Sequence, residues 1–166
     1  MIYSRSYLNN HDIDWFCKVG DFYIHVASAG GMLPKQVNDD EYLRNVQHRV
    51  AMMPDVFKDD DIVYNEQAIS NVLRQDVEIG KTYGEARAQY IESFTAMARK
   101  GFVSLDRTNI LELDDNCYHV VCYPWTYRMI DSWDLDIMIY NDFFEGWGEI
   151  MPVEFYKVGE EEWRVL

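Results

Sequence analysis

The stretch 82–106 carries a complete set of helix signals and then continues as a strand, and it constrains the fold more than any other part of the chain. Thr82 and Glu85 form the Thr-x-x-Glu pattern of a capping box, in which each side chain accepts from the other residue's backbone amide. Apolar side chains then recur at helical spacing and predict one buried stripe, made of Tyr83, Ala86, Tyr90, Ile91, Phe94, Met97 and Ala98. Gly101 fits the left-handed position that ends a helix. We therefore predict a helix over 83–100 that packs on a sheet.

The remaining elements follow from hydrophobic periodicity and from turn residues. β-Branched and aromatic runs predict strands at residues 2–8, 13–19, 22–27, 102–106, 110–113, 117–123, 135–144, 153–158 and 163–166. Two more helices are expected, over 39–53 with Asn38 as its cap and over 66–76 with Asn65 as its cap. Strands, then about three helices, then strands again indicate an α+β fold with an antiparallel sheet. The length favours a single domain over residues 1–166.

The charge of the chain is strongly negative and unevenly spread. The formal net charge is −14, with 29 acidic and 15 basic side chains. Residues 1–100 hold 15 acidic and 11 basic side chains, whereas residues 101–166 hold 14 and 4. Such a surface repels a phosphate backbone and an anionic membrane, so neither nucleic acid nor membrane is an expected partner. A basic protein is the expected partner, although plain solubility also accounts for an acidic surface.

The cysteines and the hydropathy bear on the compartment. Cys17, Cys117 and Cys122 are an odd number without a disulfide-framework spacing, so we expect free, buried thiols in a reducing setting. No apolar run approaches the length of a membrane span, and the first residues lack the apolar region of a signal peptide. These features predict a cytoplasmic protein.

Five polar residues are candidates for catalysis. His25 and Ser28 lie where a strand runs into a small-residue turn that ends at two glycines. Asp106 and Arg107 end another strand, and His119 lies on a neighbouring one. If the histidines and Asp106 converge, they would form a general acid–base site of a small hydrolase or transferase. The alternative is structural: a surface Asp–Arg pair, and histidines whose hydrogen bonds are satisfied within the sheet.

No cofactor or metal is expected. The two Asp-x-Asp fragments, at 12–14 and 134–136, have the ligand type that Mg²⁺ prefers, but such fragments are frequent by chance in a chain this acidic. Cys117 and His119 lack the second ligand pair that a structural zinc site requires.

Aromatic residues interleave with acidic ones in the C-terminal part of the chain. Large aromatic side chains anchor many protein interfaces, and aspartate beside them can pair with lysine or arginine of a partner. The candidate binding residues are Tyr123, Trp125, Tyr127, Trp133 and Trp147. The alternative is that part of this set fills the core, because so many large apolar side chains cannot all stay exposed.

Three functions remain open at this point. The favoured one is an acidic interaction domain, similar in charge to inhibitor and immunity proteins, that binds a basic partner. The second is the small hydrolase or transferase that uses the two histidines, and whether the chain is an enzyme therefore stays open. The third is a self-assembling structural component. The sequence names neither a substrate nor a partner.

Overall fold

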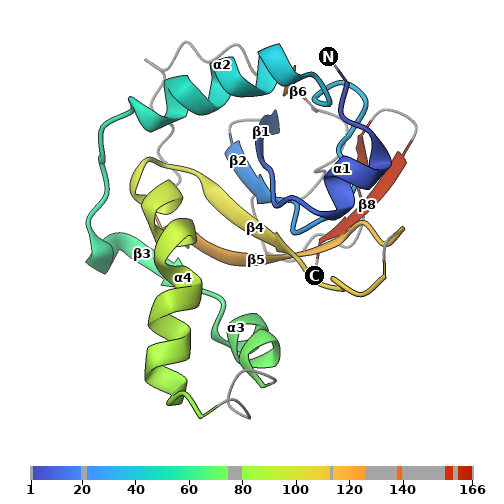
Figure 1. The fold of residues 1–166 in the computed structure, drawn as a ribbon. Helices are drawn as coiled ribbons and strands as arrows, with labels where there is room; N and C mark the ends of the chain where they lie inside the picture. Colours follow the sequence, from blue (N-terminus) through green and yellow to red (C-terminus); the bar gives the residue numbers. More distant parts are fainter. Residues whose placement is uncertain are drawn as a thin grey trace.

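The computed structural model describes residues 2–19, 22–74, 80–112, 114–125, 138–139, 156–158 and 161–165. Within these residues, no helix combines the length and the apolar character that crossing a membrane requires. The chain has an α+β fold, in which helices pack around a central sheet (Figure 1).

The sheet is mixed, which corrects the expectation of an antiparallel one. Its strand order is β6-β1-β2-β4-β5-β8-β7, and β3 also pairs with β5. Neighbours β1–β2, β4–β5, β3–β5 and β7–β8 are antiparallel, whereas β1–β6, β2–β4 and β5–β8 are parallel. The bounds are β1 Asp14–Val19, β2 Phe22–Ala27, β3 Ile62–Tyr64, β4 Val103–Arg107, β5 Cys117–Pro124, β6 Met138–Ile139, β7 Tyr156–Val158 and β8 Glu161–Val165.

The parallel pair β2–β4 explains why the antiparallel prediction was wrong. The helical part of the chain lies between these two strands in sequence. A connection of this length can carry the chain back to the end of the sheet where it started, as parallel pairing requires. The sequence predicts the order of strands and helices, but it does not predict the direction in which β4 joins β2.

Each α-helix begins at a residue whose side chain accepts a hydrogen bond from the first turn. The helices with their caps are α1 Arg5–Asn9 after Ser4, α2 Asp40–Ala51 after Asp39, α3 Glu66–Leu73 after Asn65, and α4 Tyr83–Arg99 after Thr82. The three predicted helices are confirmed over the described residues. The cap of α2 is Asp39 rather than Asn38. The side-chain oxygen Oδ1 of Asn38 instead accepts from the Tyr3 amide.

The first element corrects a second expectation, because residues 2–8 contain the helix α1 and not a strand. Ser4 caps this helix by accepting from the Tyr7 amide at 3.2 Å. Tyr3, Tyr7 and His11 then stack at helical i, i+4 spacing, with ring centroids 4.7 and 3.8 Å apart. Tyrosine has a high strand propensity. Here, however, the stacked rings are four residues apart in sequence, and a helical turn brings residues at that spacing together.

Helix α4 has the predicted start and end. Thr82 and Glu85 make both bonds of the capping box, each at 3.2 Å. At the other end, the Gly101 amide bonds to Ala98 O, and the Phe102 amide bonds to Met97 O. This pair of bonds is the Schellman motif, and Gly101 has the positive φ, +105°, that the motif requires.

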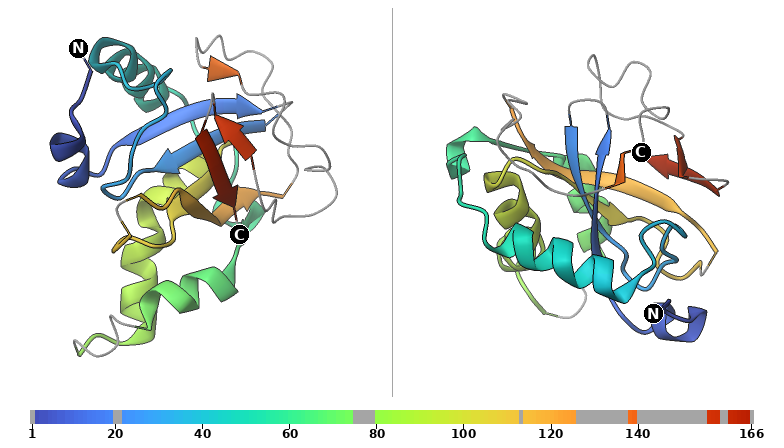
Figure 2. Two further views of the ribbon diagram at one scale, coloured as in Figure 1. Left: turned by 90° about the vertical axis from the view of Figure 1, so that its right-hand side faces the viewer. Right: turned by 90° about the horizontal axis from the view of Figure 1, so that it is seen from above.

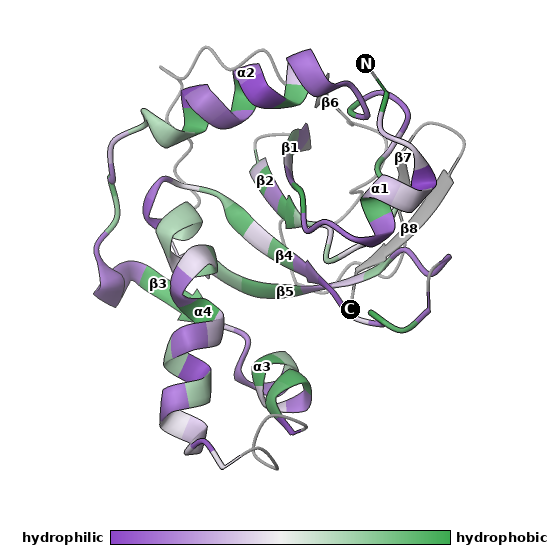
Figure 3. Cartoon of the chain, viewed as in Figure 1, coloured by the Kyte–Doolittle hydropathy of each residue, from purple (hydrophilic) through white to green (hydrophobic). Residues whose placement is uncertain are grey.

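The two faces of the sheet carry separate clusters of buried side chains. One face holds Trp15, Cys17, Ile24, Val26, Val103, Leu105, Tyr118 and Val120, packed against Leu8 of α1 and Leu43 of α2. The opposite face holds Ala27, Val121 and Cys122 against Ile69 and Leu73 of α3 and Phe94 and Ala98 of α4. A third cluster joins Phe16 to the later part of α2 and to Phe102. Figure 3 shows the apolar residues of β4 and β5 beside these helices.

The remaining predictions divide between confirmed and wrong ones. Strands over 13–19, 22–27, 102–106 and 117–123 are confirmed to within one residue. The described strands β7 and β8 overlap the predicted strands 153–158 and 163–166, and they pair antiparallel. The strand over 110–113 is wrong, because residues 110–111 are in a turn. Strand β3 was not predicted, because three aspartates precede it and it is only three residues long. Most of the predicted strand 135–144 lies outside the described residues.

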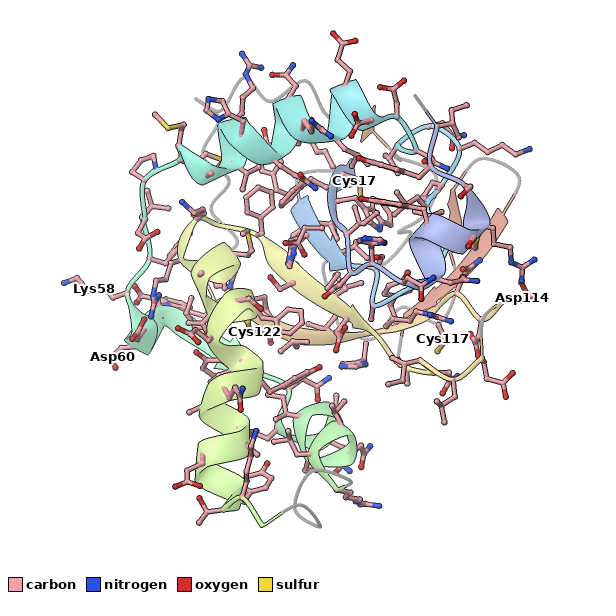
Figure 4. The ribbon with its side chains drawn as sticks, in the orientation of Figure 1. Cys17, Lys58, Asp60, Asp114, Cys117 and Cys122 are labelled. Atoms are coloured by element: carbon pink, nitrogen blue, oxygen red, sulfur yellow. The ribbon has the colours of Figure 1, made fainter. Side chains whose placement is uncertain are left out.

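The three cysteines are free and buried, as predicted. Figure 4 shows them at separate places within the fold. Burial raises the pKa of the Cys17 thiol, and it raises the pKa of Cys122 to about 12. Thiols held in the protonated form are poor nucleophiles, so these side chains act as small core residues.

Candidate functional site

Asp106 and His119 face each other across strands β4 and β5, on the side of the sheet that α4 covers. The distance from His119 Nε2 to Asp106 Oδ2 is 4.0 Å. Tyr90 of α4 bridges them, because its hydroxyl lies 2.6 Å from Asp106 Oδ2 and 3.0 Å from His119 Nε2. The structure therefore brings together two of the five predicted catalytic residues and adds a tyrosine from the helix.

The hydrogen bonds of this cluster have one consistent direction. The Tyr90 hydroxyl has a single proton and donates it to the Asp106 carboxylate, so the His119 Nε2–H must be the donor toward Tyr90 Oη. His119 Nδ1 is then an acceptor, and Thr108 Oγ1 donates to it at 3.0 Å. Asp106 Oδ1 also accepts from the Arg107 amide at 2.9 Å. The chain Thr108–His119–Tyr90–Asp106 satisfies every one of these polar groups with a neutral histidine.

Burial moves the two titratable groups of this chain in opposite directions. Desolvation raises the pKa of Asp106 to about 6, although the hydrogen bond from Tyr90 opposes this rise. Desolvation lowers the pKa of His119 to about 4. Burial, together with the charge of Asp106, also raises the pKa of Tyr90. At neutral pH the stable arrangement is thus an ionised Asp106 and a neutral His119.

His25 lies on the same face of the sheet as His119 but two strands away, about 10 Å by strand spacing. Its Nε2 donates to Asp14 Oδ1 at 2.9 Å, and its Nδ1 lies 3.1 Å from Ser104 Oγ. The side chain is buried, with 1% of the residue exposed. His25 and His119 therefore have separate hydrogen-bond partners, and within the described residues no hydrogen bond joins the two rings.

Ser28 and Arg107 hold loops in place. The Ser28 hydroxyl accepts from the Ile13 amide at 2.7 Å. Arg107 is buried, and its guanidinium donates to the carbonyl oxygens of Ala29, Glu112 and Asp115. The Arg107 contacts occupy donors of its guanidinium, and the Ile13 contact uses the Ser28 hydroxyl oxygen as an acceptor. The catalytic role of the five residues stays a prediction, and the contacts favour the structural alternative for the histidines. The surface Asp–Arg pair of that alternative is wrong, because Arg107 is buried and its guanidinium donates to carbonyl oxygens of loops.

A cavity of about 420 Å³ lies between α1, β1 and α2, and Met97 of α4 reaches it. None of the five predicted catalytic residues lines it. Asp14 lines it, with its side chain 48% exposed and one carboxylate oxygen bonded to His25 Nε2. The lining thus contacts the predicted set at two points, through the bond between Asp14 and His25 and through the bond between the Ile13 amide and Ser28 Oγ.

The predicted binding residue Trp125 is exposed, at 59%, just after the end of β5. Its amide donates to Asp61 O at 2.9 Å, and its indole Nε1 lies 3.4 Å from Asp61 Oδ1. Asp61 ends a short 3-10 turn of three aspartates, Asp59–Asp61, directly before β3. Tyr123 is partly buried against the core. The predicted binding residues Tyr127, Trp133 and Trp147 lie outside the described residues.

We call the group Asp59, Asp60, Asp61, Val63 and Trp125 the Trp125 surface. Val63 pairs with Tyr123 across β3 and β5, and Asp61 lies opposite Trp125, so these side chains share one face of the sheet. Val63 is exposed, and so are Asp59 and Asp60. Figure 4 shows Lys58 and Asp60 pointing away from the body of the protein at this end. Arg99 neutralises one of the aspartates by pairing with Asp59 at 2.6 Å.

Sequence reasoning missed the partners of the two histidines. The sequence pattern places Tyr90 in the apolar stripe of its helix and gives no role to Thr108 or Ser104. It considers Asp14 only as part of an Asp-x-Asp fragment. A signal was present for Tyr90, because a buried tyrosine requires a hydrogen-bond partner for its hydroxyl. Its partner comes from the sheet, and only the packing of α4 on β4 and β5 identifies it.

Within the described residues, no group of three or more His, Cys, Asp or Glu side chains lies close enough to hold a metal ion. The expectation of no metal and no cofactor stays a prediction.

Comparison with family models, curated proteins and solved structures gives no match for this chain. Its function must therefore be inferred from its own residues.

Proposed function

We propose that this chain is an acidic binding domain whose partner is a basic protein. The observation that carries the proposal is the exposed indole of Trp125, held against a turn of three aspartates. Tryptophan is among the residues that most often dominate the energy of a protein interface. Its apolar ring gives contact area, and the carboxylates around it give charge that a lysine or arginine can match.

The geometry at Trp125 supports an anchor that is already in place before a partner arrives. The backbone bond to Asp61 O and the indole contact with Asp61 Oδ1 hold the residue at two points. A side chain that is held in this way loses less conformational entropy on binding. Val63 beside it is an exposed apolar residue on the same sheet face, which enlarges the contact area.

The charge of the whole chain supports the same class of partner. A net charge of −14 attracts a cationic protein over several ångströms and raises the rate of encounter. The nearby Arg99–Asp59 pair and the exposed Lys58 limit the local charge, so the local attraction comes from the excess of Asp60 and Asp61 over Lys58. We expect the association to weaken as salt is added, because salt screens exposed charges.

A selection experiment tests this proposal. The full chain is immobilised, binders are selected from a random peptide display library, and the charge of the enriched peptides is compared with that of the starting library. Enriched peptides should be rich in lysine and arginine, and their affinity should fall as sodium chloride rises from about 50 mM to about 500 mM. Neutral or acidic binders, or affinities that salt leaves unchanged, would overturn the proposal.

The enzyme alternative, a hydrolase or transferase using His25 and His119 with Asp106 and Arg107, has less support. It calls for one open pocket where at least three of these residues meet. His25 and His119 are 1% and 3% exposed, and each is engaged in its own hydrogen bonds. Self-assembly is the remaining alternative, and the elution volume of the protein at several concentrations separates it from both.

A further inference from the structure

The cavity between α1, β1 and α2 has a wall of hydrogen-bond acceptors. Asp12 and Asp14 line it, and each uses one carboxylate oxygen within the protein. Asp12 Oδ1 accepts from the Ala29 amide at 2.8 Å, and Asp14 Oδ1 accepts from His25 Nε2 at 2.9 Å. These bonds fix both carboxylates in orientation. The second oxygen of each is left for a ligand that donates hydrogen bonds.

Gln47 adds a further acceptor to the lining. Gln47 Nε2 donates to Asp14 O at 2.8 Å, so the amide group is oriented and its carbonyl oxygen is left as an acceptor. His11 Nδ1 lies 2.7 Å from Tyr7 O, a carbonyl that can only accept, so Nδ1 carries a proton and donates this bond. The described lining contains neither lysine nor arginine. An anion would thus meet carboxylates without a compensating cation.

The rest of the lining is apolar or aromatic. Ile13, Ala51 and Met97 supply accessible apolar surface. Phe16 and Val50, at 2% and 1% exposed, offer almost none. The ring of Tyr7 lies between those of Tyr3 and His11, with interplanar angles of 8° and 10°. Both faces of the middle ring are therefore covered, and the column forms a stiff wall rather than an open aromatic face for a cation.

We propose that this cavity binds an alkyl cation, with a guanidinium or ammonium head on Asp12 and Asp14 and an apolar stem on Ile13, Ala51 and Met97. A cationic head supplies only donors, which matches the two carboxylates of the lining. The stem removes apolar surface of the cavity from water. Such a group is either a small organic cation or the arginine or lysine side chain of a protein.

The binding of n-butylguanidinium to the full chain tests the site, with n-butylurea as the matched neutral compound. Titration is followed by isothermal calorimetry and by amide chemical shifts in a ¹H–¹⁵N spectrum. We expect saturable binding of the cation, shifts at the amides of Asp14 and Gln47, and binding of the urea weaker by about tenfold or more. Equal binding of the two compounds, or no binding of the cation, would overturn the proposal.

Two charge-removing variants locate the head group. Asp14→Asn keeps an oxygen that can accept from His25 and removes the charge, and Asp12→Asn does the same beside Ala29. Each should weaken n-butylguanidinium binding by about tenfold. Asp60→Asn makes the same charge change on the Trp125 surface and should leave the binding unchanged. Circular dichroism spectra confirm that the variants fold, and equal losses in all three variants would show a general charge effect and refute the site.

A third arm separates the two sources of the cation and keeps this test apart from the proposed function. The arm uses the blocked tripeptide acetyl-Gly-Arg-Gly-amide. Binding at least as tight as that of n-butylguanidinium assigns the cavity to a protein side chain, and exclusion of the peptide assigns it to a small molecule. Figures 1 and 2 show α1 and β3 toward opposite ends of the molecule, so Trp125→Ala should leave cation binding in the cavity intact.

Discussion

The Tyr90 hydroxyl donates a hydrogen bond of 2.6 Å to the Asp106 carboxylate, and this bond ties the middle of α4 to the sheet. The same hydroxyl oxygen accepts from His119. Tyr90→Phe removes both contacts while it keeps the ring, so a buried carboxylate loses one donor and a buried imidazole loses its acceptor. We expect a loss of about 2–4 kcal/mol in the free energy of unfolding, measured by urea denaturation. Tyr83→Phe, at an exposed position of the same helix, is the control and should change little.

The pKa values of Asp106 and His119 predict opposite dependences of stability on pH. Asp106 has a folded pKa of about 6, above its ordinary value of 3.8, so its contribution is present at low pH and is lost as pH rises through 6. His119 has a folded pKa of about 4, below its ordinary value of 6.5, so its contribution is present above 6.5 and is lost as pH falls through 4. The two contributions, each on the order of 3 kcal/mol, nearly cancel between pH 4 and 6.5.

Single variants of the pair separate these contributions. His119→Asn leaves the Asp106 contribution, so its free energy of unfolding relative to wild type should rise as pH falls from about 6.5 to about 4.5. Asp106→Asn leaves the His119 contribution and should show the opposite slope. Urea denaturation at several pH values measures both, and other titrating groups cancel in the comparison with wild type. Two slopes of the same sign would contradict the assigned pKa shifts.

Two glycines of the α4 region should respond to alanine in opposite ways. Gly101 has φ of +105°, where a Cβ is strained, so Gly101→Ala should cost about 1–3 kcal/mol. Gly84 lies in the first turn of the helix, and an added Cβ there meets nothing within 4 Å. Gly84→Ala should therefore stabilise by about 0.5–1 kcal/mol, because it reduces the conformational freedom of the unfolded chain. Thermal and urea denaturation measure both changes.

Arg107 tests whether the predicted catalytic residues are structural. Its guanidinium bonds three carbonyl oxygens from two loops, and lysine cannot reproduce that fork. Arg107→Lys should cost about 3 kcal/mol or more, because carbonyl groups that are buried with the guanidinium lose their donors. Arg44→Ala, at an exposed arginine, is the control and should have no measurable effect. Full stability of Arg107→Lys would show that the contacts do not hold the loops.

The sequence predicts those parts of the fold that depend on local signals. Thr82, Glu85 and Gly101 determine where α4 begins and ends, and each acts within a few residues of itself. The helix α1 within residues 2–8 and the strand β3 were not predicted. A short segment rich in tyrosine or aspartate takes its structure from the elements that it packs against. The parallel pairing of β4 with β2 depends on how the helices between them pack, and local sequence patterns do not determine that packing.

The candidate sites show the same division. The sequence analysis considers a convergence of His25, His119 and Asp106. The structure brings His119 and Asp106 together but leaves His25 two strands away from His119 with its own partners. The role of Tyr90 could not be predicted, because its hydroxyl meets the pair only when α4 lies on the sheet. The cavity combines residues from α1, β1, α2 and α4, so no single stretch of sequence contains its pattern.

The dissociation constant of a basic peptide, measured with and without the Trp125 ring, tests whether the Trp125 surface binds a basic partner. Isothermal calorimetry measures an enriched basic peptide against the wild-type chain and against Trp125→Ala, with Tyr83→Ala as a second exposed-aromatic variant. We predict that Trp125→Ala weakens binding by about tenfold or more, the effect of removing an interface anchor, and that Tyr83→Ala leaves it unchanged. Equal dissociation constants for wild type and Trp125→Ala would contradict the claim.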